Sequence, residues 1–317
     1  MKIAVLGGCG FIGSHVCDQL LERGFEILII GRCVHNPLSN INHIISNKDV
    51  EFKQADIRDF KSIEKALKNC EAIMNYAALI NVDESIQTPR LFFDVNVLGA
   101  FNILEIARKK EIPLLYKSSS EVFGHVPYPD KADETYPQMP RSPYAVSKLC
   151  AERYNLAYNL TYGLPIVISR GFNTFGPRQK AGKFGAVIPK FITRVIDNKP
   201  PMIFGDGLQT RDYVFVKDMA QADVMILEAL IDGKIPGGEI FNICSMKDHS
   251  IKDIAYKIIK LCEMDHLMEP VFINARPGEV RRLIGTSKKI KQTLGWQPKT
   301  TFNEGLMQTI DFFRNNE

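Results

Sequence analysis

The sequence predicts an α/β protein built on a doubly wound parallel sheet, with a smaller lobe interleaved in the chain. Apolar strand-like runs alternate with amphipathic helical patterns through the first half of the 317 residues. A glycine-rich turn directly follows the first apolar run, and after about residue 173 the alternation ends and glycine and proline become frequent. Strands that alternate with helices indicate parallel strands joined by right-handed crossovers.

The individual elements follow from the position of each apolar run. The predicted strands are 3–6, 26–30, 51–54, 72–75, 114–117 and 166–171, and the predicted helices are 12–23, 62–68, 89–109 and 144–162. Residues 214–216 and 240–242 resemble strands that return to the main sheet or its edge. We therefore predict a dinucleotide-binding domain over 1–172 plus about 214–246, and a substrate lobe over about 173–213 plus 247–317.

Bulk composition excludes several classes of protein. A net charge of +4 is mild, so nucleic acid is not an expected partner. The most basic stretch, 288–291, has a helical pattern and is predicted to be a solvated face. Seven cysteines without regular spacing are typical of reduced thiols. The sequence has no C-x-x-C pair and no H-E-x-x-H motif, so we do not expect a metal site. The first strand starts at Lys2 and no apolar run reaches membrane-spanning length, so we expect a soluble cytoplasmic protein without a membrane partner.

The first thirteen residues carry the strongest motif. Gly7, Gly10 and Gly13 stand between the first strand and the first helix. In this context Gly7 permits a tight turn, Gly10 lets a pyrophosphate approach the backbone, and Gly13 lets the helix pack on the strand. The N–H groups at the helix start, near Phe11 and Ile12, then face the phosphates. The motif predicts a Rossmann-type fold that binds a dinucleotide.

The end of the second strand predicts which dinucleotide binds. An acidic residue there usually accepts hydrogen bonds from the ribose of NAD, but this chain has Gly31 and Arg32. Glycine leaves space and arginine can hold a 2′-phosphate, so we expect NADP, with NAD as the alternative. We expect further cofactor contacts after the third and fourth strands, from Asp56, Ile57, Tyr76, Ala77 and Ala78.

A tyrosine and a lysine four residues apart predict the catalytic centre. Tyr144 and Lys148 lie on one face of a predicted helix, so both side chains can reach one site. A nearby ammonium is expected to lower the pKa of the tyrosine, and Lys148 can also hold the nicotinamide ribose. Ser119, at the end of the fifth strand, can hydrogen-bond a sugar hydroxyl and pass its proton to Tyr144.

Taken together, these motifs resemble the extended short-chain dehydrogenase/reductase superfamily, in its NAD-dependent epimerase/dehydratase branch that acts on nucleotide sugars. The matching stretches cover nearly the whole chain: GGCGFIGSH, ADIRD, YAALINVDES, NVLGAFNILE, SSSEVFG, SPYAVSK, RGFNTFGPRQ, VIPKFI, GDGLQTRDYVFVKD and RPGEVRRLIGTSKKIKQTLGW. The resemblance implies a tightly bound, recycled cofactor that oxidises the sugar C4 hydroxyl to a ketone. It makes Tyr144 the C4 base and places Asn96 and Phe172 beside the cofactor.

The same resemblance implies a site for a nucleotide-diphosphate sugar. The positions that match it are Asn173, Val187, Arg211, Arg276 and Glu279. Two arginines on separate loops can clamp a diphosphate, and a glutamate can accept hydrogen bonds from a ribose. Leu283 matches the position that limits bulk at the C2 substituent of the sugar, and its size leaves glucose and N-acetylglucosamine open.

Glu121 bears on the type of reaction. In this family, simple 4-epimerases usually have a small residue there, whereas dehydratases and decarboxylases usually have a glutamate. A carboxylate can remove the C5 proton once C4 is a ketone, and an acid beside it can assist loss of the 6-hydroxyl. Ser120 is a weak acid, and the stretches FNTFGPRQ and AVIPKFI are closer to epimerases and decarboxylases. We expect dehydratase-type chemistry, with a UDP-hexose 4-epimerase as the alternative.

Two further hypotheses belong to other classes, namely a non-catalytic NADP-binding regulator and a dehydrogenase with net redox turnover. The intact set of Ser119, Tyr144 and Lys148 disfavours a regulator.

The resemblance also implies a homodimer formed by the helices near 89–109 and 144–162. The apolar positions that we assign to this interface are Phe92, Val95, Phe101, Leu149, Leu156 and Leu160.

Overall fold

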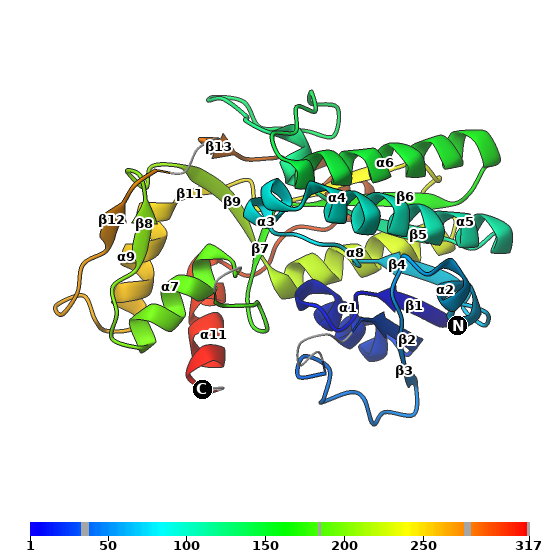
Figure 1. Ribbon diagram of the computed structural model, residues 1–317, viewed down its shortest axis with the longest axis horizontal. Coiled ribbons are helices and arrows are strands. Elements are labelled where there is room, and N and C mark those ends of the chain that lie inside the picture. The colour runs from blue at the N-terminus through cyan, green and yellow to red at the C-terminus, as the bar shows by residue number, and fades with distance from the viewer. Residues whose placement is uncertain (33–37, 183–184, 276–279, 316–317) are drawn as a thin grey trace.

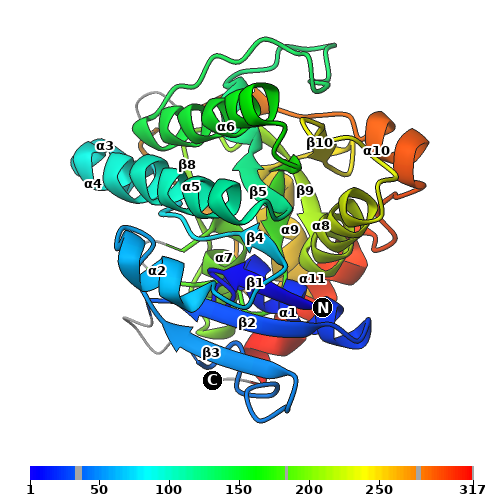
Figure 2. The ribbon, with the colours of Figure 1, turned by 90° about the vertical axis from the view of Figure 1, so that its right-hand side faces the viewer.

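The computed structural model describes residues 1–32, 38–182, 185–275 and 280–315. Within these ranges its central element is a seven-stranded sheet in the order β3-β2-β1-β4-β5-β6-β10, with every neighbouring pair parallel (Figures 1 and 2). Its strands are β1 (Lys2–Leu6), β2 (Glu26–Gly31), β3 (Val50–Gln54), β4 (Ala72–Asn75), β5 (Leu114–Ser119), β6 (Ile166–Gly171) and β10 (Ile240–Ile243). The predicted doubly wound parallel sheet is confirmed.

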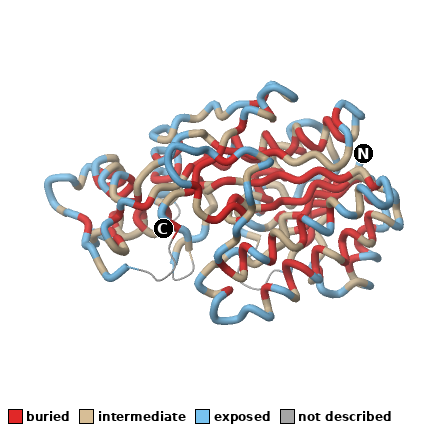
Figure 3. Tube along the Cα trace, turned by 90° about the horizontal axis from the view of Figure 1, so that it is seen from above, coloured by how far each residue is buried: buried red, intermediate tan, exposed pale blue. Residues whose placement is uncertain are grey.

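The strands at the centre of this sheet are apolar because both of its faces are covered. In β1, Ile3 and Val5 face one core, whereas Ala4 and Leu6 face the other. Successive side chains of a strand point to opposite faces, so a continuous apolar run serves two cores at once. In Figure 3 the buried strands form a continuous band through the large domain.

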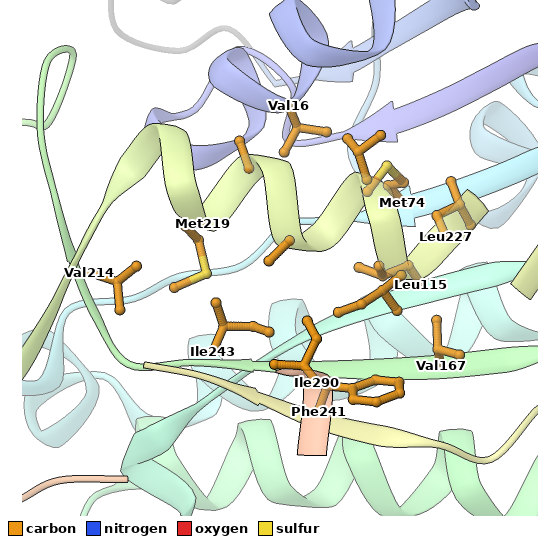
Figure 4. Packing of buried hydrophobic residues seen from close by; sticks show 14 of the residues in the cluster. Val16, Met74, Leu115, Val167, Val214, Met219, Leu227, Phe241, Ile243 and Ile290 are labelled. Atoms are coloured by element: carbon orange, nitrogen blue, oxygen red, sulfur yellow. The ribbon is translucent and has the colours of Figure 1, made fainter. Parts of the chain in front are cut away.

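Helices cover the two faces in separate layers (Figure 2). One layer contains α2 (Phe60–Ala66), α5 (Ala100–Lys110) and α6 (Pro143–Tyr162). The other contains α1 (Phe11–Glu22), α8 (Val216–Ile231) and α10 (Lys288–Leu294). Figure 4 shows how Met219 and Leu227 of α8 pack among residues of the sheet, such as Leu115 and Phe241. In α10, Ile290 is buried while Lys288 and Lys291 are exposed, as predicted for that basic stretch.

The predicted helix 89–109 is not one regular α-helix. It consists of α4 (Pro89–Phe92), a π-helix η1 (Phe93–Gly99) and α5, and α3 (Val82–Gln87) precedes it. The wider π turn changes which side chains face inward. Phe92 and Val95, which we assigned to a dimer interface, are both buried within this chain. A π-helical segment often marks a functional site.

The smaller lobe has its own core and is built around a sheet in the order β11-β9-β13, with β7 also paired to β9 (Figure 1, left). Its strands are β7 (Asn173–Phe175), β9 (Thr210–Phe215), β11 (Asp248–Ser250) and β13 (Arg282–Leu283), with β8 (Met202–Phe204) and β12 (Val271–Ile273) as a separate pair. Its helices are α7 (Val187–Ile196), α9 (Ile251–Leu261) and α11 (Phe302–Arg314).

The strand predicted at 214–216 is confirmed for 214–215, but its predicted return to the main sheet was wrong. Val214 and Phe215 end β9, which belongs to the smaller sheet, and α8 already begins at Val216. The assignment to the main sheet failed because an apolar run indicates a buried strand without indicating its sheet. Val214 and Phe215 are buried in the smaller sheet. The edge strand of the main sheet is β10, as predicted for 240–242. The chain also returns to the large domain after β13, where α10 packs against β10 and α8.

The order of the strands places the ligand crevice. The sheet runs from β1 through β2 to β3 on one side, and from β1 through β4 to β5 and β6 on the other. Ligands of such sheets bind outside the carboxyl ends of the strands, at this change of direction.

In the described part of the chain, no helix combines the length and apolar character needed to cross a membrane.

Candidate active site

The glycine-rich turn lies where the sequence predicts it, between β1 and α1. Gly7 has a φ of +79°, and a Cβ there would lie 2.8 Å from the backbone of Ala77. A Cβ on Gly13 would lie 2.4 Å from the carbonyl oxygen of Gly7, so only glycine permits this close packing. Ser14 N donates to Gly10 O, so the N–H groups of residues 11–13 precede the first helical hydrogen bond. These N–H groups fit a pyrophosphate.

A cavity of about 400 Å³ extends from this turn over the ends of β4, β5 and β6. The predicted residues that line it are Gly7, Gly10, Phe11, Ile12, Gly13, Tyr76, Ala78, Ser119, Ser120, Glu121, Tyr144, Lys148, Phe172 and Asn173. Ser118 also lines the cavity, and its buried Oγ lacks a hydrogen-bond partner among the residues described. The glycine cradle and this free hydroxyl fit the pyrophosphate and nicotinamide half of a dinucleotide.

The residues predicted for the adenosine half lie at the ends of β2 and β3, outside that cavity. Arg58 makes two hydrogen bonds to Asp56, of 3.0 and 2.7 Å. Arg32 Nη1 lies 4.0 Å from Asp56 Oδ2, and its side chain is 40% exposed. These arginines hold the pKa of Asp56 below its usual value. Ile57 is buried under Gly99.

Tyr144 begins α6 and is buried beside Ser119. Their side chains hydrogen-bond, and Ser119 Oγ also accepts from the N–H of Glu121 over 3.2 Å. The expected lowering of the tyrosine pKa is not observed. Burial outweighs the bond to Ser119 and raises the pKa of Tyr144 to about 12. The chain alone therefore keeps this phenol protonated, and the phenolate needs a further positive charge.

Lys148 follows Tyr144 by one turn of α6 and reaches the same cavity. Its Nζ donates to the carbonyl oxygen of Lys117 over 2.6 Å and lies 4.5 Å from the ring centre of Tyr116. Burial lowers the pKa of Lys148 to about 7, against the opposing effect of Glu152 one turn further along. Glu152 is fixed by the fully buried Arg170 of β6.

A second cavity, of about 590 Å³, lies between the large domain and the smaller lobe. Arg211 of β9 and Val187 of α7 line it, as predicted for a nucleotide-sugar site. The residues that line both cavities are Val82, Glu121, Asn173, Thr174 and Gln179. Burial raises the pKa of Glu121, and the positive charge of Arg211 opposes this shift. A carboxyl group therefore stands at the junction of the two cavities.

One predicted substrate residue among those described is not brought to these walls. Leu283 of β13 is fully buried in the main core rather than lining either cavity, because β13 pairs with β9 behind the site. The predictions for Arg276 and Glu279 fall outside the described residues.

Asn96 supports the site from the π-helix η1 instead of lining it. Its Nδ2 donates to Leu79 O and to Ser147 Oγ, both over 2.9 Å, and its Oδ1 accepts from Leu79 N over 2.8 Å. Asn96 therefore ties the loop after β4 to α6, which carries Tyr144 and Lys148. Phe172, which does line the cofactor cavity, stacks on Phe123.

Sequence reasoning missed several residues at the site. Gln179 lies at the junction, and Arg178 donates to Asp18 of α1 over 2.7 Å, which fixes the loop after β7 beside the glycine turn. Lys117 lies in the wall of the cofactor cavity. A lysine inside an apolar strand was the available signal for this last residue. Among the described residues there is no cluster of acidic, histidine and cysteine side chains that could hold a metal.

Known proteins are similar to this chain in sequence and in fold over most of their length. Residues 4–309 match the family model described as GDP-mannose 4,6 dehydratase. The chain therefore belongs to the extended short-chain dehydrogenase/reductase family of NAD-dependent epimerases and dehydratases, and it is an enzyme of the nucleotide-sugar epimerase/dehydratase class.

Three relatives illustrate this range of activities. A Methanocaldococcus jannaschii protein, provisionally named UDP-glucose 4-epimerase, is 38% identical over 99% of both chains. The dTDP-glucose 4,6-dehydratase of Salmonella typhimurium is 30% identical over 100% of this chain and 93% of its own. The UDP-glucose 4-epimerase of Thermus thermophilus, solved as a complex with NAD, has a TM-score of 0.90 and 32% identity over 100% of both chains. An NAD-type cofactor is thus supported.

Proposed function

We propose that the protein converts a UDP-sugar through a 4-keto hexose intermediate by dehydratase-type elimination, with Glu121 as the base at C5. The position of Glu121 is the observation that carries this proposal. Glu121 lines both cavities, with Tyr144 in the wall of one and Arg211 in the wall of the other. A sugar whose diphosphate binds near Arg211 would present its ring at this junction.

The larger cavity would hold the nucleotide. Its walls combine apolar residues such as Val187 and Phe204 with the cation of Arg211. An arginine suits a diphosphate because its planar guanidinium can donate two parallel hydrogen bonds. Asn173, at the junction, would contact the diphosphate sugar. By the family pattern, Arg276 would complete the clamp and Glu279 would accept hydrogen bonds from the ribose.

The chemistry at C4 would belong to Tyr144 and its neighbours. Tyr144 would take the proton of the C4 hydroxyl, and Ser119, bonded to it, would bridge to the sugar. When bound, the oxidised nicotinamide would accept the C4 hydride, return it later, and add a positive charge that favours the Tyr144 phenolate. Lys148 would hold the nicotinamide ribose from the same helix face.

The chemistry at C5 would belong to Glu121. A ketone at C4 acidifies the C5 proton, and burial raises the pKa of Glu121 toward the range of an effective general base. Ser120 lies next to it in the same cavity wall and would assist departure of the 6-hydroxyl as water. After elimination, the proton returned to C5 would come from solvent.

For the cofactor we propose NADP, with NAD as the alternative. Arg58 already makes two hydrogen bonds to Asp56, whereas Arg32 has only a 4.0 Å ion pair within the described residues. The guanidinium of Arg32 is therefore available for a 2′-phosphate. Gly31 beside it adds no side chain that would exclude this group.

A second candidate is a UDP-hexose 4-epimerase. Ser120 favours it, because a hydroxyl is a weaker acid than a carboxyl group and elimination needs an acid at the leaving group. A 4-epimerase needs the groups at C4 alone, so Glu121 would then be a structural carboxylate. Two of the three relatives described above carry the name of this activity.

The test is incubation of the purified protein with UDP-, dTDP- and GDP-hexoses in deuterated water, followed by mass spectrometry of each product. Elimination predicts a product that has lost water and gained one solvent deuterium from a UDP-sugar. An isomer without solvent deuterium would support the 4-epimerase instead. Stoichiometric consumption of added reduced cofactor would indicate a dehydrogenase with net turnover.

A further inference from the structure

A buried ion pair lies in the floor of the cofactor cavity. The Nζ of Lys117 lies 2.9 and 2.8 Å from the two carboxylate oxygens of Asp223 on α8. It also contacts Ser169 Oγ and Met219 Sδ, each at 2.9 Å. Lys117 lines the cavity, whereas the fully buried Asp223 lies behind it. The positively charged residue of the pair is therefore the one nearer to the cavity.

Asp223 holds Lys117 within a network of hydrogen bonds. The Oδ2 of Asp223 accepts from the hydroxyl of Tyr76 over 2.9 Å, and its Oδ1 accepts from the hydroxyl of Ser169. With Lys117, three side-chain donors therefore converge on one carboxylate. Burial lowers the pKa of Lys117, and the charge of Asp223 opposes this shift.

The sheet order determines which half of the cofactor meets this charge. The adenosine residues end β2 and β3, on one side of β1. Lys117 is on β5, two strands away on the other side, and a Cβ on Gly171 of β6 would lie 3.2 Å from its Nζ. Its carbonyl oxygen holds Lys148. A dinucleotide that spans the change of strand order would therefore place its nicotinamide half on the side of β1 that holds β5 and Lys117.

We propose that Lys117, held by Asp223, makes the bound oxidised nicotinamide easier to reduce. The oxidised ring carries a positive charge and the dihydro ring does not. A fixed ammonium near the bound ring would therefore raise the free energy of the oxidised form relative to the reduced form. Lys117 thus favours hydride transfer from the substrate to the cofactor. This inference concerns the cofactor alone and does not depend on which sugar the enzyme converts.

The test compares the wild-type full chain with the double variant Lys117→Gln/Asp223→Asn, which keeps a hydrogen-bonded pair and removes both charges. Each protein is equilibrated with a fixed mixture of NAD⁺ and NADH, and in parallel with NADP⁺ and NADPH. The bound ratio is read from nicotinamide absorbance after rapid gel filtration. We expect the bound ratio of reduced to oxidised cofactor to be about fivefold lower in the variant.

Two further variants keep the outcome decisive. Ser169→Ala removes two hydrogen bonds of the cluster, to Lys117 and to Asp223, but neither charge, and should leave the ratio unchanged. Lys117→Met/Asp223→Leu replaces the pair by apolar side chains, which buried sites often tolerate, and should lower the ratio like the amide pair. A merely structural role would weaken both cofactor forms equally. An unchanged ratio in both charge-free variants, or a wild-type protein that retains neither form, would overturn the proposal.

Discussion

The Nζ atom of Lys148 donates a hydrogen bond to the carbonyl oxygen of Lys117 over 2.6 Å, with the ring of Tyr116 on another side. Both partners are neutral, so they offset less of the cost of burying an ammonium than a carboxylate would. Burial consequently lowers the pKa of Lys148 to about 7. The ammonium that we propose to hold the nicotinamide ribose is therefore kept in the site at the expense of stability.

This relationship predicts a pH-dependent gain in stability for Lys148→Met. An unfolded lysine has a pKa of about 10.5, so between pH 7 and 10.5 the unfolded chain binds a proton that the folded chain does not. The contribution of Lys148 to the free energy of unfolding therefore rises with pH by up to about 1.4 kcal/mol per unit. Lys148→Met should be more stable than wild type at pH 7, with an advantage that shrinks toward pH 10. Urea unfolding at a series of pH values measures this, and an advantage independent of pH would contradict it.

Tyr144→Phe should remove the proposed base at C4 while leaving the fold and the nucleotide cavity intact. We expect kcat to fall by about 10²–10⁴-fold, the usual range for loss of a general base, with unchanged affinity for UDP. Tyr154→Phe is a matched control, because Tyr154 is an exposed tyrosine of the same helix. Steady-state kinetics and calorimetry with UDP test both expectations. Substantial activity in Tyr144→Phe would show that another group takes the C4 proton.

Arg32→Asp should reverse the preference for the cofactor. Loss of a bidentate contact to the 2′-phosphate should weaken NADP binding by about 1.5–3 kcal/mol, while NAD gains an acceptor for its ribose. Lys48→Asp changes the net charge equally at another exposed position and should have little effect. Calorimetric titration of the wild type and of both variants with each cofactor gives the six dissociation constants. Equal affinity of the wild type for NADP and NAD would reject the role of Arg32.

The helical layer that carries α6 and η1 should form a homodimer interface. Phe92 and Val95 point inward, but their neighbours Phe93 and Leu98 are 51% and 44% exposed, and Val146 of α6 is 51% exposed. We expect a dimer mass by light scattering at micromolar concentration, and a monomer for Phe93→Asp. Tyr128→Asp, a substitution at an apolar residue that is 85% exposed, should remain dimeric. A monomeric wild type would exclude this interface.

Much of the fold could be predicted because local and global signals agree. The strands of the main sheet follow from apolar runs such as that of β1, whose residues serve two cores at once. Spacing alone predicts the glycine turn. It also predicts that Tyr144 and Lys148 share one helix face, because four residues are close to one helical turn. The π-helix around Asn96 was not predictable, since its hydrogen-bond pattern depends on packing against α6 and not on residue type.

Other errors have the same origin in tertiary structure. Val214 is apolar and would suit a buried strand of either sheet. Its place in the smaller sheet follows from the pairing of β9 with β7, which composition does not reveal. Leu283 matched a family position, but its strand pairing buries it behind the site. The predicted lowering of the Tyr144 pKa was wrong, because we assumed a nearby ammonium and neglected the effect of burial. Lys117 became meaningful only when Asp223, far away in sequence, was found beside it.

The central claim is that Glu121 removes the proton at C5, and solvent deuterium tests it most directly. Wild-type enzyme and Glu121→Gln are each incubated with the UDP-sugar substrate in deuterated water, and deuterium at C5 of the product is measured by NMR. We predict one deuterium at C5 with wild type, and a rate of incorporation lower by at least about 10²-fold in Glu121→Gln. The variant should still reduce its bound cofactor, seen as nicotinamide absorbance. A wild-type product without deuterium at C5, together with an active Glu121→Gln, would contradict elimination and leave the 4-epimerase.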